Sequence, residues 1–306
     1  MRKVIGIGET VMDILFRHQQ PEAAVPGGSC FNSIISLGRA HVPSIFVGYT
    51  GGDVVGQQTV DFLRDNGVST DYFEMRPGER SSISLAFLNE QCDANYIFYK
   101  EKPNVSEDAP IPSFGKDDVM LYGSYYAICQ DTHSQVRRML QAAKKAEAIV
   151  YYDLNIRRSH QHELDTLAPT LLDNLHMSTI VRGSADDFEV MYNQRDAAQI
   201  YEQHIRQHCP IFIYTSGPGL ISVYTPTCHI DFEVAPVETV STVGAGDSFN
   251  AGFLYALLRD GITRDQLATL SESAWQRLLT TGCSFAAQVC QSRDNYISLD
   301  FAQTLQ

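Results

Sequence analysis

Thr242-Val243-Gly244-Ala245-Gly246-Asp247-Ser248-Phe249-Asn250 joins a turn of small residues to a carboxylate. Apolar residues follow at helical spacing, and Gly261 stands where a left-handed cap ends a helix. The first amides of a helix lack intrahelical acceptors and lie at the positive end of the helix dipole. Gly244, Ala245 and Gly246 are therefore predicted to bind an anion such as phosphate, which can approach a glycine backbone closely.

Asp247 is predicted to act as a general base. A carboxylate within hydrogen-bonding reach of an alcohol can accept its proton as a bond to phosphorus forms, which contributes about 10²–10⁴ in rate. Taken alone, Asp247 is more typical of an ordinary helix cap and dipole partner. A cap does not need Gly-Ala-Gly before it, whereas a base beside a transferring phosphoryl group needs both parts.

Together with five further segments, this motif resembles the ribokinase-like sugar kinases of the phosphofructokinase-B type. The resemblance covers most of the chain, and the segments keep the family's order and rough spacing. They are residues 4–13, 27–32, 52–68, 153–157 and 215–219.

The resemblance implies an α/β fold with three layers, α/β/α, as one kinase domain over residues 1–306. A small β lid would be formed by about residues 15–26 and 74–104. The implied activity is transfer of the γ-phosphoryl group of ATP to a sugar hydroxyl, with Mg²⁺ arriving with the ATP. The partners would be a small-molecule sugar and ATP, and the family's lid often pairs two subunits, so a homodimer through the lid is one option.

The pattern of the chain agrees with this fold, because short apolar runs alternate with amphipathic helical stretches. Such alternation predicts a largely parallel sheet with helices on both faces and ligands beyond the carboxyl ends of the strands. The predicted strands are 4–7, 45–47, 119–122, 149–152, 179–181 and 211–214. The predicted helices include 31–39, 57–66, 135–146 and 164–175.

One region interrupts the alternation. Residues 82–89 and 95–100 are predicted to form a hairpin around the polar turn Glu90-Gln91-Cys92-Asp93-Ala94. With residues 15–26 it would cover the sugar site and exclude water that competes for the phosphoryl group. An ordinary edge hairpin is the alternative.

The sugar site is expected in the first third of the chain. In the family, the acid matching Asp13 accepts hydrogen bonds from two sugar hydroxyls, although a solvated loop aspartate is the alternative. Gly28 permits close backbone approach, and Asn32 offers both a donor and an acceptor. Phe98 and Lys100 complete the predicted sugar-binding set together with Asp247.

The nucleotide site is expected in the second half. Arg157 can present a planar fork to phosphate oxygens, and its family counterpart lies between the nucleotide phosphates and the substrate. An exposed surface arginine is the alternative. The resemblance adds further nucleotide-binding residues, which are Asn155, Asp187, Thr215, Gly217, Gly219, Gly244 and Gly246.

Two positions depart from the family pattern. Ser241 replaces the acid that helps to hold an activating monovalent cation, which leaves potassium dependence open. The family's Asn-x-x-Glu segment, which organises magnesium and phosphate through water, appears as Ser184-Ala185-Asp186-Asp187. Asp187 would act there with a shorter reach, and no residue is assigned as a direct metal ligand.

The opening Gly8-Glu9 and the segments 84–88 and 98–100 look most like the fructokinase branch. Fructose or a similar ketose is the expected acceptor, with a 2-keto-3-deoxygluconate or nucleoside kinase as the alternative. Lys100 stands where an arginine is frequent in the enzymes for the acid sugar. An ammonium binds a carboxylate less specifically than a guanidinium, which favours a neutral sugar.

Composition excludes several other classes. The 306 residues, 44% of them hydrophobic, can bury a large core. The chain has 36 acidic and 23 basic residues, and its net charge of −13 opposes binding to nucleic acid. Seven cysteines without a Cys-x-x-Cys pair predict free thiols in a reducing compartment. The sequence shows neither a signal-peptide pattern nor a membrane-length apolar run, so we expect a cytoplasmic protein without a membrane partner.

Two other classes of function match parts of the sequence. Gly6-Ile7-Gly8 after a strand partly matches a dinucleotide-binding motif, but Val11 occupies the third glycine position. The other rival is a non-catalytic sugar or nucleotide sensor on the same fold. The presence of Asp247 favours the kinase, because binding alone does not need a base.

Overall fold

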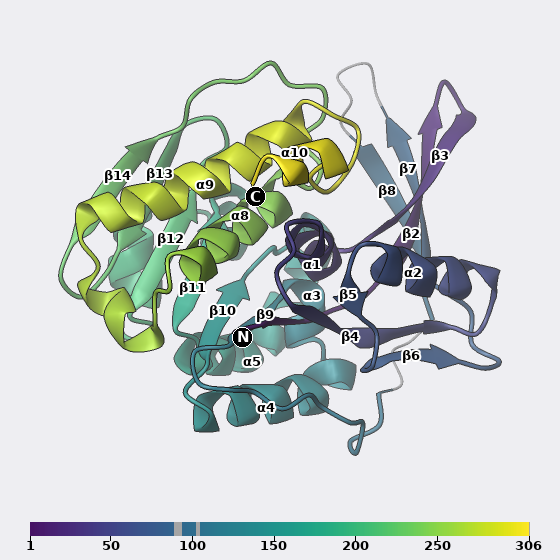
Figure 1. The fold of residues 1–306 in the computed structure, drawn as a ribbon, viewed down its shortest axis with the longest axis horizontal. Coiled ribbons are helices and arrows are strands. Elements are labelled where there is room, and N and C mark those ends of the chain that lie inside the picture. Colours follow the sequence, from purple (N-terminus) through teal and green to yellow (C-terminus); the bar gives the residue numbers. More distant parts are fainter. Residues whose placement is uncertain (89–93, 102–104, 306) are drawn as a thin grey trace.

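The computed structural model describes residues 1–88, 94–101 and 105–305. Its centre is a twisted sheet with helices on both faces, which confirms the predicted three-layer α/β class (Figure 1). The neighbouring strands run in the order β14 (His229–Glu233), β13 (Leu220–Tyr224), β12 (Ile211–Thr215), β11 (Ile180–Ser184), β10 (Ile149–Asp153), β9 (Val119–Gly123), β1 (Val4–Ile7), β4 (Ser44–Gly51) and β5 (Val68–Ser69). β6 (Phe73–Arg76) also pairs with β4.

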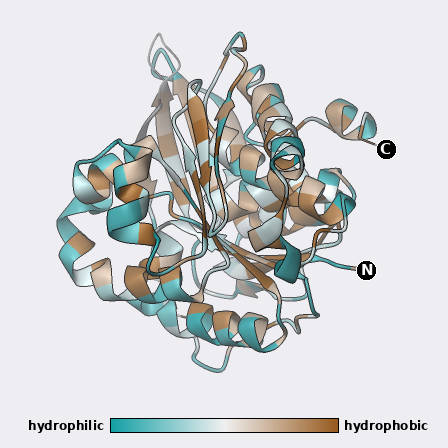
Figure 2. Ribbon diagram, turned by 90° about the vertical axis from the view of Figure 1, so that its left-hand side faces the viewer, coloured by the Kyte–Doolittle hydropathy of each residue, from teal (hydrophilic) through white to brown (hydrophobic). Residues whose placement is uncertain are grey.

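All neighbouring strands from β12 to β5 pair in parallel, and so do β4 and β6. At the other edge, β13 and β14 form an antiparallel extension. The central strands β1, β9 and β10 are buried along their whole length. Continuous apolar runs are typical of parallel strands that are covered on both faces. Figure 2 shows hydrophobic colours on the strands in the middle of the molecule and hydrophilic colours on outward-facing turns of the helices.

Two hydrophobic cores lie on the two faces of this sheet. One contains the inner sides of α1 (Ser29–Arg39), α8 (Ala245–Arg259) and α9 (Glu272–Cys290), with Phe253 and Trp275 fully buried. The other contains those of α4 (Gln130–Lys145), α5 (Leu164–Met177) and α6 (Ala185–Tyr192). The remaining helical segments are α2 (Val54–Asp65), α3 (Ser124–Ile128), η1 (Arg158–Glu163), α7 (Ala197–Ile200), η2 (Tyr201–Ile205), η3 (Arg264–Thr269) and α10 (Leu299–Gln303).

Glycines bring α8 and α9 close together. A Cβ on Gly252 of α8 would lie 2.6 Å from the carbonyl oxygen of Thr281, and one on Gly282 of α9 would lie 2.8 Å from the ring of Phe249. Gly252 and Gly282 thus allow α8, the helix that carries Asp247, to pack closely against α9.

The six predicted strands and four predicted helices are present, with shifts at their ends. The larger shifts are at the start of α4, which begins at Gln130 rather than at 135, and at the end of β4, which runs to Gly51 rather than to 47. α2 begins at Val54 rather than at 57. The earlier start of α2 follows from Asp53, whose side chain accepts a hydrogen bond from the Gly56 amide at 2.9 Å and caps the helix.

A separate small sheet projects from one side of the molecule (Figure 1). Its strand order is β3 (Gln20–Gly27), β2 (Val11–Arg17), β7 (Ile83–Leu88) and β8 (Ala94–Tyr99). The stretch expected as one piece of the lid, 15–26, is therefore a hairpin that turns at His18 and Gln19, both with positive φ. Residues 73–76 belong to β6 and pair with the main sheet, although the lid was expected from 74 onwards. Residues 90–93 of the expected turn lie outside the described residues.

No helix among the described residues is both long enough and apolar enough to cross a membrane.

Candidate active site

Asp247 lies in the first turn of α8, which begins after Gly244. Gly244 has φ of 77°, and a Cβ there would lie 2.4 Å from the carbonyl oxygen of Asn295. Only glycine combines that conformation with so close an approach. The start of α8 is thereby fixed against the chain segment that precedes α10.

The carboxylate of Asp247 is held by α1 on the neighbouring part of the molecule. Ser29 Oγ donates to Asp247 Oδ1 at 3.0 Å, and Asn32 Nδ2 donates to Oδ2 at 2.8 Å. Ser33 Oγ donates to the main-chain oxygen of Asp247 at 2.8 Å. The side chain of Asp247 is thus anchored across the interface between α1 and α8. Asp247 is not the cap of its helix, because the N-cap residue of α8 is Gly244.

Burial raises the pKa of Asp247 to about 6, although the hydrogen bond from Asn32 opposes the shift. The nearby charge of Asp153 raises this pKa further, and the charge of Arg157 lowers it. A carboxylate with a pKa near 6 is a stronger base than an ordinary aspartate and is still ionised at neutral pH.

The amides before Asp247 are not equivalent. The amide of Ala245 donates to the carbonyl oxygen of Thr242 at 3.2 Å, so it closes the turn that leads into α8. On the other side of the turn, a Cβ on Gly246 would lie 3.2 Å from the guanidinium nitrogens of Arg182. Of the three predicted anion-binding residues, Gly246 therefore lies next to a buried positive charge.

Asp13 lies in the lid strand β2 and is buried at the junction with the main domain. Ser84 Oγ, from β7, donates to Asp13 Oδ1. A Cβ on Gly27 would lie 2.6 Å from Asp13 Oδ2, so this glycine leaves room for the carboxylate. Burial raises the pKa of Asp13 to about 6, and the hydrogen bond from Ser84 and the charges of Lys100 and Arg157 oppose the shift.

Asn32 and Gly28 lie at the start of α1. Asn32 is 5% exposed, and its Oδ1 is buried without a hydrogen-bond partner within the described residues, while its Nδ2 contacts Asp247. Buried amide oxygens are normally satisfied, so this atom is a free acceptor beside the base. Gly28 has φ of 131°, and a Cβ there would lie 2.4 Å from the carbonyl oxygen of Glu9.

Lys100 contacts Glu9, with Nζ 2.7 Å from Oε2, and lies 4.6 Å from the ring centroid of Phe98. This ion pair links the end of the lid strand β8 to the loop after β1. Glu9 therefore lies beside the predicted sugar-binding residue Lys100. It was not among the predicted site residues, although it belongs to the motif at residues 4–13.

Asn155 and Arg157 line a surface pocket of about 410 Å³ beyond β10 and β11. Ser184, Asp186 and Asp187 line the same pocket. Arg157 is exposed, and its charge lowers the pKa of both Asp13 and Asp247. Arg157 thus lies where its field reaches the two predicted sugar-side carboxylates.

Asp187 is buried and forms its hydrogen bonds inside the chain. Its Oδ1 accepts from the Ile156 amide at 2.6 Å, and its Oδ2 accepts from the Ser184 amide and hydroxyl at 2.6 and 2.7 Å. Ser184 in turn caps α6 in a reciprocal arrangement. Burial raises the pKa of Asp187, against the effect of Arg182. The pair orders the loop that carries Asn155 and Arg157.

Thr215 ends β12, and its Oγ1 accepts from Arg182 Nη2 at 2.7 Å. Gly217 follows in a turn with φ of 64°, and Gly219 lies against Ser216. Because β10, β11 and β12 are parallel neighbours, their carboxyl ends bring residues 153–157, 184–187 and 215–219 to one edge.

A buried polar network beneath this edge was missed by sequence reasoning. Arg182 Nη1 contacts Asp153 Oδ1 at 3.0 Å, and Asn250 Nδ2 of α8 donates to Asp153 Oδ2 at 2.9 Å. Tyr151 Oη donates to Asn250 Oδ1 at 2.9 Å. The sequence hint of this network was Arg182, a charged residue within the strand β11.

The comparison with protein families is decisive at this point: the model of the pfkB family carbohydrate kinases matches residues 1–301. The chain belongs to the pfkB family of carbohydrate kinases. This membership confirms the resemblance and the expected class of activity, a phosphotransferase with a sugar hydroxyl as acceptor.

Relatives of this carbohydrate kinase carry fructokinase names. A fructokinase of Rhizobium leguminosarum bv. trifolii is 26% identical over 89% of this chain and 85% of that protein. A probable chloroplastic fructokinase-6 of Arabidopsis thaliana is 26% identical over 77% of this chain, which spans 63% of the plant protein. The crystal structure of the Vibrio cholerae O395 fructokinase, described with fructose, ADP and calcium bound, has a TM-score of 0.86 at 20% identity and covers 100% of this chain and 99% of that one. That likeness establishes the shared fold.

Proposed function

We propose that this carbohydrate kinase transfers the γ-phosphoryl group of ATP to a hydroxyl of fructose or a similar neutral ketose. The observation that carries the proposal is the carboxylate of Asp247, which α1 holds at the start of α8 and whose pKa is about 6. The fructokinase names of the relatives support the choice of a ketose.

The sugar would be held between the lid and α1. Asp13 supplies carboxylate oxygens, and the unpartnered Oδ1 of Asn32 supplies an acceptor for a second hydroxyl. The backbone at Gly28 would let the sugar approach closely. The acceptor hydroxyl would then lie within reach of Asp247, which shares Asn32 as a partner.

A neutral acceptor fits Lys100 better than a sugar acid does. Its ammonium is paired with Glu9 at 2.7 Å, so a substrate carboxylate placed there would compete with Glu9 and be repelled by it. The 2-keto-3-deoxygluconate alternative thereby loses its most direct partner, while a nucleoside acceptor remains the second candidate.

The nucleotide would lie along the carboxyl ends of β10 to β12. Asn155 and Arg157 line the pocket there, and the backbone turns at Gly217 and Gly219 leave space without side chains. The amides of Gly244 and Gly246 would face the γ-phosphoryl group, with the charge of Arg182 directly behind Gly246. Asp187 would act by holding the loop of Arg157 in place.

Magnesium would enter with ATP. We propose that this ion is held mainly by phosphate oxygens and water, with few direct protein ligands. Ser241 is neutral, and its Oγ accepts from the Val243 amide at 3.2 Å. A serine in this place supplies no charge to a monovalent cation, so we propose that turnover does not depend on potassium.

In the reaction, Asp247 accepts the proton of the sugar hydroxyl as its oxygen attacks the γ-phosphorus. The new oxygen–phosphorus bond forms as the bond to the β–γ bridging oxygen breaks, and ADP leaves with that oxygen. The amides at the start of α8 stabilise the charge on the equatorial oxygens. The lid excludes water, which would otherwise accept the phosphoryl group.

An assay of sugar-dependent ADP release tests this function. We expect the highest kcat/KM with fructose among ketoses, aldoses, sugar acids and nucleosides, in sodium as well as in potassium buffers. A higher kcat/KM with a nucleoside or sugar acid would reject the ketose assignment, and the absence of ADP release with every acceptor would favour a sensor.

We also propose a homodimer that forms through the lid. Three consecutive residues of β8, Ile97, Phe98 and Tyr99, are 46%, 51% and 55% exposed, although two of them are strongly apolar. Light scattering after gel filtration should give twice the mass of one chain, and Ile97→Lys should reduce it to one. A monomer before the substitution would reject this assembly.

A further inference from the structure

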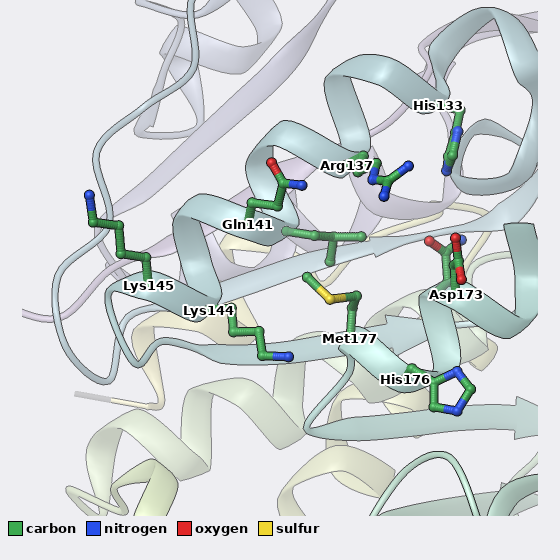
Figure 3. Close-up of a pocket in the computed structure, with 10 residues that line it drawn as sticks. His133, Arg137, Gln141, Lys144, Lys145, Asp173, His176 and Met177 are labelled. Atoms are coloured by element: carbon green, nitrogen blue, oxygen red, sulfur yellow. The ribbon is translucent and has the colours of Figure 1, made fainter.

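A second hollow lies between α4 and α5, which pack on the opposite face of the sheet from α8 (Figure 3). Its volume is about 510 Å³. α4 contributes His133, Arg137, Gln141 and Lys144, and α5 contributes Asp173 and Met177. None of these residues belongs to the proposed sugar or nucleotide site.

The residues of α4 face the hollow together because they recur three or four positions apart. Figure 3 shows the side chains of Arg137 and Lys144 extending over the space beside Met177, whereas Lys145 points away along the surface. Two cationic groups thus border one cavity, and the side chain of Met177 lies between them.

Neither Arg137 nor Lys144 has an ion-pair partner within the described residues, in a chain whose net charge is −13. Lys116, in contrast, is paired with Glu147 at 3.1 Å and Asp265 at 3.6 Å. The helix dipole accounts for a lysine in the last turn of α4, such as Lys144, but not for an arginine in its middle. Two unpaired cations beside one hollow favour an anionic ligand.

Of the two histidines in the wall, His176 does not compete for this role. His176 Nδ1 lies 3.0 Å from the carbonyl oxygen of Leu172, and its Nε2 lies 2.9 Å from His208 Nδ1. Both ring nitrogens are thereby used inside the chain, so His176 forms part of the wall.

We propose that this hollow binds a small phosphorylated metabolite, separately from the active site. Arg137 offers a planar fork and Lys144 a point charge to the phosphate. Asp173 and Gln141 can bond to hydroxyl groups, and Leu140 and Met177 offer apolar contact to a carbon skeleton. The chemistry of the wall therefore matches a phosphate ester of a small polyol or sugar.

Isothermal titration with glucose 6-phosphate, glycerol 3-phosphate and inorganic phosphate tests the site. The wild-type chain, the double variant R137Q/K144Q and the control Lys116→Gln are compared with fructose and a non-hydrolysable ATP analogue present to occupy the active site. Circular dichroism and thermal unfolding establish that each variant is folded. A second variant, Met177→Ser, tests the contact to the carbon skeleton.

We expect the wild type and the Lys116→Gln control to bind at least one ester equally, and R137Q/K144Q to bind it at least about tenfold more weakly, because two charge-assisted contacts are lost. Met177→Ser should weaken the ester and leave inorganic phosphate unchanged. Equal affinity in all variants, or no binding by the wild type, would overturn the site. Equal affinity for inorganic phosphate and every ester would overturn the assignment to an ester. These outcomes do not depend on whether the chain phosphorylates fructose.

Discussion

Arg182 and Asp153 form a buried ion pair directly behind the first turn of α8, with Nη1 and Oδ1 3.0 Å apart. Burial lowers the pKa of Arg182, but the charge of Asp153 raises it, and the net shift is upward. The same guanidinium contacts Thr215 and lies beside Gly246. One pair therefore joins β10, β11 and β12 to the helix that carries Asp247.

This ion pair should affect both the free energy of unfolding and the pKa of Asp247. Replacing Arg182 by Met leaves the charge of Asp153 buried and unpaired, which should cost about 3–5 kcal/mol in unfolding free energy. The double variant R182M/D153N should recover much of that loss. In any folded Arg182→Met protein the acid limb of the pH–rate profile should move upward, because the unbalanced charge of Asp153 raises the pKa of Asp247 further. An unchanged acid limb would show that the ion pair does not influence the pKa of Asp247.

Asp247→Asn should reduce kcat by at least about 10², because the variant has no proton acceptor. Binding of the ATP analogue, measured by calorimetry, should change little. The matched control is Asp131→Asn, which removes a carboxylate from the first turn of α4 and should leave kcat unchanged. Wild-type turnover in the Asp247→Asn protein would remove Asp247 from the chemistry.

Activity should fall as the pH falls through about 6. Asp247 must be ionised to accept a proton, and Asp13 must be ionised to accept hydrogen bonds with both oxygens; burial raises the pKa of each to about 6. The effect on stability has the opposite sign. These groups bind protons more tightly in the folded than in the unfolded chain, so their contribution to stability decreases as the pH rises from about 4 to 6. Measurements of kcat/KM and of urea unfolding across pH 4–8 check both signs. A kcat/KM constant from pH 5 to 8 would contradict the proposed roles.

Gly244→Ala should disrupt the start of α8 far more than Gly261→Ala does. Both glycines have positive φ, at 77° and 66°, but a Cβ meets Asn295 only at Gly244 and has nothing within 4 Å at Gly261. Gly261→Ala should cost roughly 1–2 kcal/mol from its backbone conformation alone, and Gly244→Ala clearly more. The Gly244→Ala protein should also lose turnover. Equal melting temperatures of the two variants would show that the contact with Asn295 relaxes freely.

Arg157→Ala should raise the KM for ATP by about tenfold through the loss of charge-assisted contacts, while the fold is preserved because the side chain is exposed. The neighbouring Arg158 lines the same pocket, but its guanidinium is paired with Glu189 at 3.2 Å, so Arg158→Ala is the comparison with a smaller expected effect. Identical ATP kinetics before and after the Arg157 substitution would exclude it from the nucleotide site.

The order of the elements could be predicted because it depends on local patterns. Short apolar runs marked the buried strands, the amphipathic stretches marked the helices between them, and Gly-Ala-Gly-Asp marked the start of α8. The start of α2 was placed too late, since its cap depends on the single polar side chain of Asp53 rather than on a repeated pattern. α4 was also placed too late, and it begins after Cys129 without a side-chain cap.

The α/β class follows from the alternation of apolar runs and amphipathic stretches along the chain, and the kinase family follows from short motifs such as Gly-Ala-Gly-Asp, because both signals lie in neighbouring residues. The packing of segments that are far apart in the chain sets which contacts the site residues make. It placed Asn32 against Asp247, turned Asp187 toward the Ile156 amide, and paired Arg182 with Asp153. These contacts join residues 29 to 215 positions apart, and the burial that raises the pKa of Asp13 and Asp247 exists only once the segments are packed together.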